Sequence, residues 1–174
     1  MLSNLGNSLL FLNVLLSIII IFYSLKSVKS SSNVIPSKIF KISLIQTTFV
    51  MSCFFTLVAA FIISDFSLAN VYQNSHSSKP LFYKIAGTWG SHEGSLMLWI
   101  IILTIFSFLF LIKNYKHPKN YRLYTLIFQN IIILGFLSFI FFNSNPFSKV
   151  SPIPMEGLGL NPILQDPALV IHPP

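Results

Sequence analysis

The stretch Leu5–Leu25 reads LGNSLLFLNVLLSIIIIFYSL and contains no Asp, Glu, Lys or Arg. It is long enough to cross a bilayer as a helix, which takes roughly 20 apolar residues. Three similar uncharged stretches follow it, so that the four are Leu5–Leu25, Ile42–Ile63, Gly94–Ile112 and Leu123–Phe142. Because lipid offers the backbone no hydrogen-bonding partner, each stretch is predicted to be helical despite its many Ile and Phe residues. The sequence therefore predicts an all-α integral membrane protein with about four transmembrane helices.

The composition excludes an ordinary water-soluble domain. Of the 174 residues, 53% are hydrophobic and only 9% are charged, whereas a soluble domain usually has about 25% charged residues. The net charge of +7 does not indicate nucleic-acid binding, because the basic residues are few and lie at the ends of the predicted helices. The membrane is the expected partner, and nucleic acid is not.

The basic residues are unevenly divided between the loops. The first and third loops hold eight of them, namely Lys26, Lys29, Lys38, Lys41, Lys113, Lys116, Lys119 and Arg122. The second loop and the tail hold only Lys79, Lys84 and Lys149. The positive-inside rule then puts the first and third loops on the cytoplasmic side or its organellar equivalent. Both chain termini are expected on the outer face, with all four acidic residues: Asp65, Glu93, Glu156 and Asp166.

The start of the chain bears on the compartment. The first apolar stretch lacks a basic beginning and a small-residue cleavage site, so we expect a retained helix and not a signal peptide. No Arg-rich transit peptide is visible, and the abundance of Phe, Ile, Lys and Asn is typical of an A+T-rich genome. These features favour a multi-pass protein of the mitochondrial inner membrane that is made inside the organelle. The bacterial inner membrane is the second candidate.

The spans themselves offer little reactive chemistry. Cys53 is the single cysteine and lies in the second span, where we expect it to pack as a small hydrophobic residue. The sequence has no C-x-x-C-H motif, so the chain does not itself carry a covalently attached c-type haem by that route. No Lys, Asp or Glu interrupts a span, which argues against a proton pump or antiporter.

The chain divides into a transmembrane region, residues 1–143, and an outer segment, residues 144–174. Seven of the ten prolines lie in Asn145–Pro174. Proline at that density prevents helix formation and favours extended backbone, so a non-helical tail is expected. Because apolar residues alternate with these prolines, the tail is expected to pack against another surface.

The segment Gly87–Ser95, GTWGSHEGS, stands at the predicted outer end of the third span. Trp89 suits an interfacial anchor. Ser91 suits the helix N-cap, and Glu93 suits the positive end of the helix dipole. The adjacent His92 and Glu93 point in different directions on a helix, which is poor geometry for a shared metal ion.

The remaining histidines fall into two groups. His76 and His117 lie in polar loops and are expected to be solvated. His172 precedes Pro173, which restricts its backbone to extended conformations. An imidazole on such a stiffened backbone at a membrane surface is a candidate ligand for haem iron, and the sequence indicates no other metal site.

Two stretches resemble the CcmF family, the large haem-handling component of cytochrome c maturation. Gly87–Trp99, GTWGSHEGSLMLW, resembles the opening of an early transmembrane helix of that family. The tail, with SNPF from Ser144 and then PMEGLGLNPILQDPALVIHPP, resembles the next outer segment. The start Leu5-Gly6 is similar too, although Asn7 stands where bacterial members tend to have His. The chain is thus similar to the N-terminal portion of the family.

The resemblance implies that the chain is part of a haem lyase assembly that holds haem and helps attach it to apocytochrome c. His172 corresponds to an axial haem ligand in the family's HPP motif. The other motif residues, whose roles are not settled, are Trp89, Gly90, His92, Glu93, Gly94, Asn161, Pro162, Gln165, Asp166, Pro167 and Pro173. The chain ends before the family's Trp-rich haem-binding loop, so we expect one piece of a split gene or a truncated fragment, with haem bound only alongside partner chains.

The implied partners are the remaining haem-lyase chain or chains carrying the Trp-rich loop, a haem chaperone and apocytochrome c. As an enzyme, the chain is expected to be an incomplete part of a haem lyase, without catalytic residues that can be named. An alternative of a different class is a structural or transport subunit of another organelle inner-membrane complex. Four plain apolar helices and an organelle-like composition fit that alternative.

Overall fold

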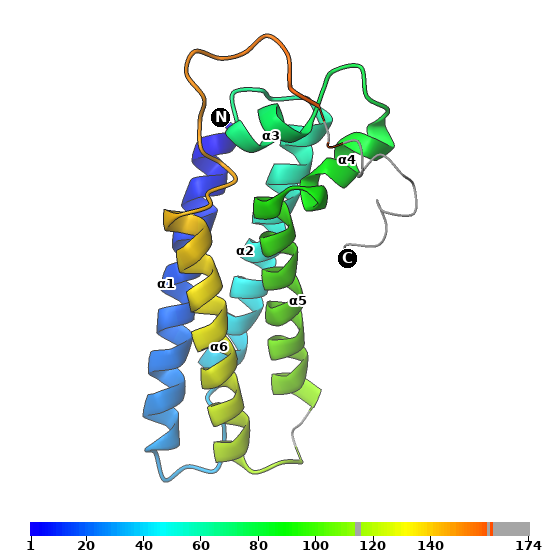
Figure 1. The fold of residues 1–174 in the computed structure, drawn as a ribbon. Helices are drawn as coiled ribbons and strands as arrows, with labels where there is room; N and C mark the ends of the chain where they lie inside the picture. Colours follow the sequence, from blue (N-terminus) through cyan, green and yellow to red (C-terminus); the bar gives the residue numbers. More distant parts are fainter. Residues whose placement is uncertain (114–115, 160, 162–174) are drawn as a thin grey trace.

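The computed structural model describes residues 1–113, 116–159 and 161, and its dominant feature is an upright bundle of long helices (Figure 1). Four of the described helices are long and apolar enough to cross a membrane: α1 (Leu2–Val28), α2 (Ser37–Ile62), α5 (His92–Lys113) and α6 (Lys119–Phe142). They coincide with the four predicted spans and extend each by up to five residues, except at the end of α2. The prediction of a four-span helical membrane protein is confirmed.

The bundle is packed through the small and polar face of α1. That helix lies against α6 and α2, and α5 completes the bundle by packing on α2 and α6. The buried positions of α1 include Ser3, Gly6 and Ser17, which let neighbouring backbones approach closely, as is usual between membrane helices. Inside the bundle, the amide of Gln46 on α2 donates a 2.7 Å hydrogen bond to Ser17 Oγ.

The outward face of the bundle is apolar, as a lipid-facing surface requires. Large exposed side chains include Phe11, Phe55, Phe106 and Phe128, one from each long helix. Cys53 is fully buried in the core, with its Sγ 3.6 Å from the carbonyl oxygen of Gly6. The expectation that this thiol packs as a small hydrophobic residue is confirmed.

One end of the bundle carries the loop 29–36, the end of α5 and the start of α6, and we call it the basic end because the eight basic residues of the first and third loops lie there. Pro36 and Pro118 immediately precede α2 and α6. Proline disfavours helical backbone at the residue that precedes it, so a helix is not extended in the N-terminal direction past such a proline. The two helices therefore begin directly after these prolines.

The opposite end, which we call the capped end, contains two short helices that the sequence analysis did not predict. Where the sequence analysis expected only the second loop, between the second and third spans, the structure has α3 (Ala69–Asn74) and α4 (Leu81–Gly90) (Figure 1). Both are shorter than a membrane span, so the search for long apolar stretches missed them. α4 buries Ala86, Gly87 and Thr88 and packs on α2 and α5.

The described part of the tail lies on the same end and is held by backbone pairing. The N–H of Ala69 donates to Ser148 O, and the N–H of Val150 donates to Ser67 O, both at 2.9 Å. The Phe147 ring is fully buried against α1, so close to Gly6 that a Cβ there would lie 2.3 Å from the ring. The tail is thus anchored at the same end as the N-terminus. The expectation that its apolar side chains pack against another surface is not confirmed for Ile153, Met155 and Leu158, which are 67%, 100% and 70% exposed.

Candidate functional site at the capped end

The GTWGSHEGS motif forms a sharp corner between two helices. α4 ends at Gly90, Ser91 is extended (φ −81°, ψ 152°), and α5 begins at His92. The motif is thus divided between α4 and α5, whereas the sequence analysis placed it at the opening of a single span. Its predicted N-cap is confirmed, because the N–H of Gly94 donates to Ser91 Oγ at 3.1 Å.

The same corner explains why position 94 is a glycine. The hydroxyl of Ser91 donates to Thr88 O at 2.9 Å, which draws the end of α4 onto the first turn of α5. A Cβ on Gly94 would lie 1.5 Å from Thr88 O and 2.8 Å from Ser91 Oγ. No side-chain rotation relieves the first contact, since Thr88 O belongs to the backbone. Packing at this corner therefore explains why position 94 is a glycine, and the explanation involves no ligand.

The adjacent residues His92 and Glu93 have separate hydrogen-bonding partners. Glu93 lies in the first turn of α5, and its Oε2 accepts a 3.3 Å hydrogen bond from the buried amide of Asn70 on α3. His92 is exposed, and its Nδ1 shares a 3.2 Å hydrogen bond with Ser144 Oγ. Glu93 thus ties α5 to α3, while His92 ties it to the tail.

The two tryptophans of this region differ in their surroundings. Trp89 is half-buried and packs against the main hydrophobic core, so it contributes to the fold of the corner. Trp99, on α5, is 59% exposed, which suits a position at a lipid-facing surface. Gly90 is partly buried and ends α4.

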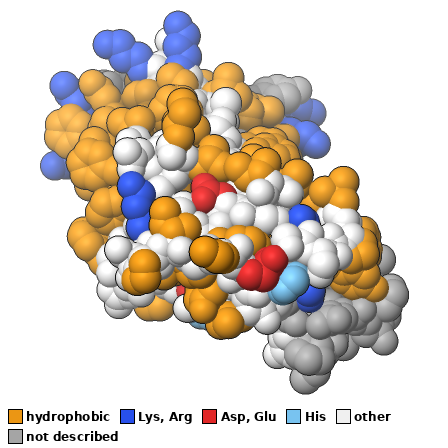
Figure 2. Space-filling model, turned by 90° about the horizontal axis from the view of Figure 1, so that it is seen from above, with side chains coloured by type: hydrophobic (Ala, Val, Ile, Leu, Met, Phe, Trp, Pro, Cys, Tyr) orange, Lys and Arg blue, Asp and Glu red, His pale blue; other side chains and the backbone are white. Residues whose placement is uncertain are grey.

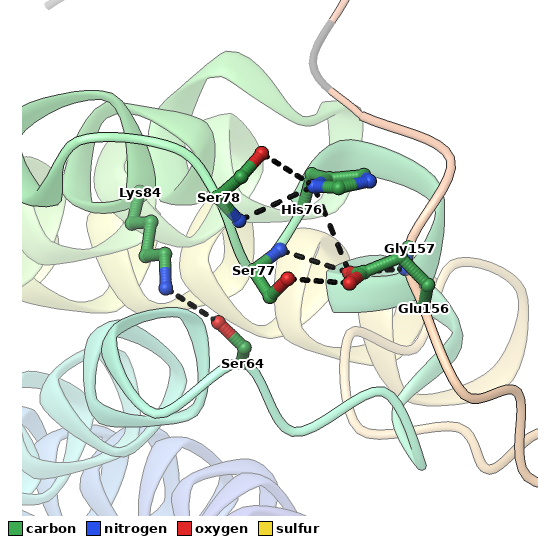
Figure 3. A network of polar contacts seen from close by, with 7 residues as sticks. All are labelled: Ser64, His76, Ser77, Ser78, Lys84, Glu156 and Gly157. Carbon is green, nitrogen blue, oxygen red and sulfur yellow. Dashed lines mark hydrogen bonds and ion pairs between the residues drawn. The ribbon is translucent and has the colours of Figure 1, made fainter.

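A second polar cluster, which we call the tail clamp, joins the tail to the loop after α3 (Figure 3). It consists of His76, Ser77, Glu156 and Gly157. Glu156 Oε1 accepts hydrogen bonds from the N–H of Ser77 at 2.8 Å and from the N–H of Gly157 at 3.0 Å, and Oε2 accepts one from the Ser77 hydroxyl. These donors, led by the Ser77 hydroxyl, lower the pKa of Glu156 to about 2. The clamp therefore favours the ionised carboxylate.

His76 is the outer member of the clamp. Its Nδ1 lies 3.8 Å from Glu156 Oε1 and accepts a 3.2 Å hydrogen bond from the N–H of Ser78. An accepting Nδ1 means that the proton of the neutral ring is on Nε2. His76 is solvent-accessible, as expected, with 37% of its side chain exposed, and the fold of the loop in addition brings it against the tail. His117 is exposed at the basic end, as expected, and the centroid of its ring lies 5.3 Å from that of the Tyr121 ring.

The backbone of the tail continues the clamp. The N–H of Leu158 donates to Tyr72 O at 2.8 Å, and that of Gly159 donates to Ser75 O at 3.0 Å. A Cβ on Gly157 would lie 2.0 Å from Ser75 O, so only glycine permits this approach. The backbone at residues 156–159 is consequently held by both main-chain and side-chain hydrogen bonds.

Two lysines complete the polar groups beside the clamp. Lys84 Nζ donates a 2.8 Å hydrogen bond to Ser64 Oγ (Figure 3). Burial lowers the pKa of Lys79, whose Nζ has no hydrogen-bonding partner among the described residues. Viewed from above, acidic and histidine side chains meet on this end within a largely uncharged surface (Figure 2).

The predicted site residues of the tail lie mostly outside the described residues. This applies to Pro162, Gln165, Asp166, Pro167, His172 and Pro173. Asn161 is described and exposed. Within the described ranges, no three His, Cys, Asp or Glu side chains are grouped to hold a metal ion. The expectation that His172 is a ligand of haem iron is not tested by the described geometry.

Sequence reasoning missed the tail clamp altogether. Ser77 and Glu156 are 79 positions apart and share no motif, so only the fold shows that they meet. One available signal was the acidic Glu156 beside Gly157, within an otherwise apolar and proline-rich stretch.

The structure is a four-span bundle in which one end carries two short helices and a clamped tail. It therefore belongs to the class of multi-pass membrane proteins, with its short helices and tail contacts gathered at one end of the bundle. Comparison with known proteins specifies the family. Residues 89–174 match the family model described as "Cytochrome C assembly protein". The chain is 48% identical over 132 residues to cytochrome c-type biogenesis protein CycK of Bradyrhizobium diazoefficiens, covering 76% of this chain and 20% of that protein.

The alignment with a second relative covers the whole chain. Cytochrome c-type biogenesis protein CcmF of Escherichia coli (strain K12) is 37% identical over 177 residues, covering 100% of this chain and 27% of that protein. The solved structure "Cytochrome c Heme Lyase CcmF" superposes with a TM-score of 0.78 at 21% identity, covering 87% of this chain and 26% of that one, and it shares the fold. The chain belongs to the CcmF/CycK cytochrome c assembly family and spans about a quarter or less of these relatives' length.

Proposed function

We propose that this chain is the N-terminal part of a CcmF-type haem lyase assembly, which holds haem and helps attach it to apocytochrome c. The observation that carries the proposal is family membership together with a capped end that fixes the start of the HPP-containing tail. The relatives are named for cytochrome c biogenesis and haem lyase activity. The chain would share this work with the remaining haem-lyase chain or chains, a haem chaperone and apocytochrome c.

Two features support an outer position for the capped end. The eight basic residues of the first and third loops gather at the opposite end, which the positive-inside rule puts on the cytoplasmic or matrix side. The three described acids lie at the capped end. With this orientation, the N-terminus and the tail face the compartment where cytochrome c receives its haem.

His172 is the proposed axial ligand of haem iron, and the chain's contribution is to position it. The tail clamp and the hydrogen bonds of Leu158 and Gly159 fix the backbone up to residue 159, thirteen residues before this histidine. A fixed origin restricts the volume that His172 can reach, which lowers the entropic cost of ligation. When bound, haem would supply the vinyl groups that react with the cytochrome thiols.

The membrane in which the chain works is part of the proposal. The composition favours the mitochondrial inner membrane, whereas the relatives named above are bacterial, which favours the second candidate, a bacterial inner membrane. The alternative function, a subunit of another organelle complex, is not proposed, because no described feature favours it over the assembly role of the family.

The test is a gene deletion complemented by matched histidine variants. Loss of the chain should abolish c-type cytochromes and spare b-type ones, as measured from visible spectra of the membranes. His172→Ala should reduce haem retention in the purified assembly and lower cytochrome c output, while His117→Ala at the basic end should leave both unchanged. Normal c-type cytochromes in the deletion strain would refute the proposal, and normal output from His172→Ala would remove that residue from the site.

A further inference from the structure

A shallow groove runs along the outside of the bundle between α5 and α6, which pack side by side (Figure 1). We call it the α5–α6 groove. It has a volume of about 410 Å³, and the residues that line it are all apolar: Leu96, Ile132, Gly135, Phe136 and Phe139. Gly135 is exposed, and a Cβ added there would meet no atom within 4 Å. A further helix would therefore approach the backbone of α6 closely here, as small residues permit between membrane helices.

The groove lies in the membrane-spanning part of α6. At about 1.5 Å per residue, the 24 residues of α6 extend over about 36 Å, only about 6 Å more than the hydrocarbon layer. Gly135 is seven residues from the nearer end of α6, which is roughly 10 Å. The surroundings of Gly135 are therefore either lipid chains or another transmembrane segment.

A polar side chain without a partner lies beside the groove. Gln129 precedes Ile132 by three residues and Phe136 by seven, a spacing that places the three on one side of α6. Its side chain is half-buried, its Oε1 is covered and unpaired, and its amide nitrogen makes no hydrogen bond with the described residues. Because it is the oxygen that the bundle covers, the nitrogen is the group that an outside partner can reach. An amide donor left unpaired in hydrocarbon is costly.

Other polar side chains on the outer surface are satisfied without a partner. Thr48 and Ser52 on α2 are both exposed, and their hydroxyls donate to Leu44 O at 3.0 Å and to Thr48 O at 2.9 Å, within the same helix. Lipid chains are adequate surroundings for such hydroxyls, but they offer no acceptor to Gln129. A neighbouring helix supplies one, because side-chain and backbone oxygens form hydrogen bonds between membrane helices. The unpaired amide thus favours a protein segment over lipid in the groove.

The length of the relatives indicates which protein that segment belongs to. This chain covers 20% of the CycK relative and 27% of the CcmF relative, and the solved structure shares the fold over 26% of its own chain. The proposed function assigns the remaining length to the other haem-lyase chain or chains. Within the membrane, spans from that remainder meet this bundle only on its lateral surface, which is where the α5–α6 groove lies.

We propose that the α5–α6 groove seats a transmembrane helix of the remaining haem-lyase chain or chains. The inference rests on the proposed function, which supplies this partner. The helix would pack closely against Gly135, and an oxygen on it would accept a hydrogen bond from the amide nitrogen of Gln129. This contact would hold the bundle, and with it the clamped tail, against the part of the assembly that carries the Trp-rich loop.

The first experiment is Phe139→p-benzoylphenylalanine, a photocrosslinking replacement in the groove, in membranes that contain the whole assembly. Irradiation should join residue 139 to a transmembrane peptide of the remaining haem lyase, identified by mass spectrometry. The matched control is the same replacement at Phe55, which is 60% exposed on α2 and should react with lipid. Adducts at residue 139 with lipid alone or with a second copy of this chain would overturn the proposal, and so would equal haem-lyase adducts at both positions.

Two substitutions test the two contacts, read as the amount of haem-lyase chain that co-purifies with the tagged chain in mild detergent. Gly135→Leu fills the groove and should lower that amount about tenfold, because the partner helix would be overpacked. Gln129→Leu removes the amide and should lower it roughly threefold to tenfold. The matched control is Thr48→Val, whose lost hydroxyl is bonded within α2, and it should leave the amount unchanged. Unchanged amounts for the groove variants would overturn the assigned contacts.

Two controls separate docking from folding and from the function itself. Both groove variants should unfold in SDS at the wild-type midpoint, and a midpoint lowered in step with co-purification would assign these residues to the bundle and overturn the proposal. A wild-type chain that co-purifies with the haem lyase but gives only lipid adducts at residue 139 would refute the groove and leave the proposed function standing. A wild-type chain that co-purifies with no haem-lyase chain would refute the proposed function.

Discussion

Replacing Gly94 by Ala should destabilise the corner between α4 and α5 far more than the same change elsewhere in the bundle. The added Cβ would lie 1.5 Å from Thr88 O, whereas real Cβ atoms essentially never come within 3.0 Å of another heavy atom. The Thr88 carbonyl must therefore move by roughly 1.5 Å, and such overpacking costs about 1–3 kcal/mol. The movement also disrupts the Ser91 cap, which adds about 1 kcal/mol.

The matched control is Gly135→Ala on α6. A Cβ at Gly135 meets nothing within 4 Å, so this change should be neutral or stabilise the helix by up to about 1 kcal/mol. Gly94→Ala gains at most the same propensity, so the two identical substitutions should differ by about 2–4 kcal/mol, or roughly 30- to 1,000-fold in the unfolding equilibrium.

The assay is unfolding in mixed micelles, with the fraction of SDS raised stepwise and the helix content followed by circular dichroism. Tryptophan fluorescence adds a local reading, since Trp89 and Trp99 flank the corner. Equal unfolding midpoints for the two alanine variants would refute the structural explanation of Gly94. Its presence in the motif would then call for a functional reason.

Two further predictions concern the tail. The pKa of Glu156 is about 2 in the folded protein against an ordinary 4.5, so the clamp's stabilisation is complete above pH 4.5 and lost as the pH falls towards 2. The protection factors of the amides of residues 156–159, which compare observed exchange with the intrinsic rate at each pH, should fall over that window in the wild type and should be low already at pH 7 in Glu156→Gln; an identical acid response in the variant would contradict this. Phe147→Ala should lower stability by about 3–5 kcal/mol, since its ring is fully buried, and should expose the tail to proteolysis. Phe142→Ala, at a side chain that is 76% exposed, is the control, and similar effects of both would disprove the anchoring role.

The four transmembrane helices could be predicted because the composition of the sequence indicates that lipid surrounds them. Long uncharged stretches have one stable form in lipid, so the four spans were located to within five residues. The Ser91 cap was also predictable, because it depends on residues three positions apart. α3 and α4 were missed, since short helices at a membrane surface obtain their stability from packing and not from length or hydropathy.

The sequence by itself determined the membrane class, the separation of a basic end from an acidic one, and the resemblance to a family of cytochrome c assembly proteins. The tertiary structure alone decided which distant residues meet: Phe147 with Gly6, Glu156 with Ser77, and Asn70 with Glu93. The physical reason is the range of the interactions. Partition into lipid and helix capping depend on a local run of residues, whereas hydrogen bonds and close packing between segments exist only once the chain has folded.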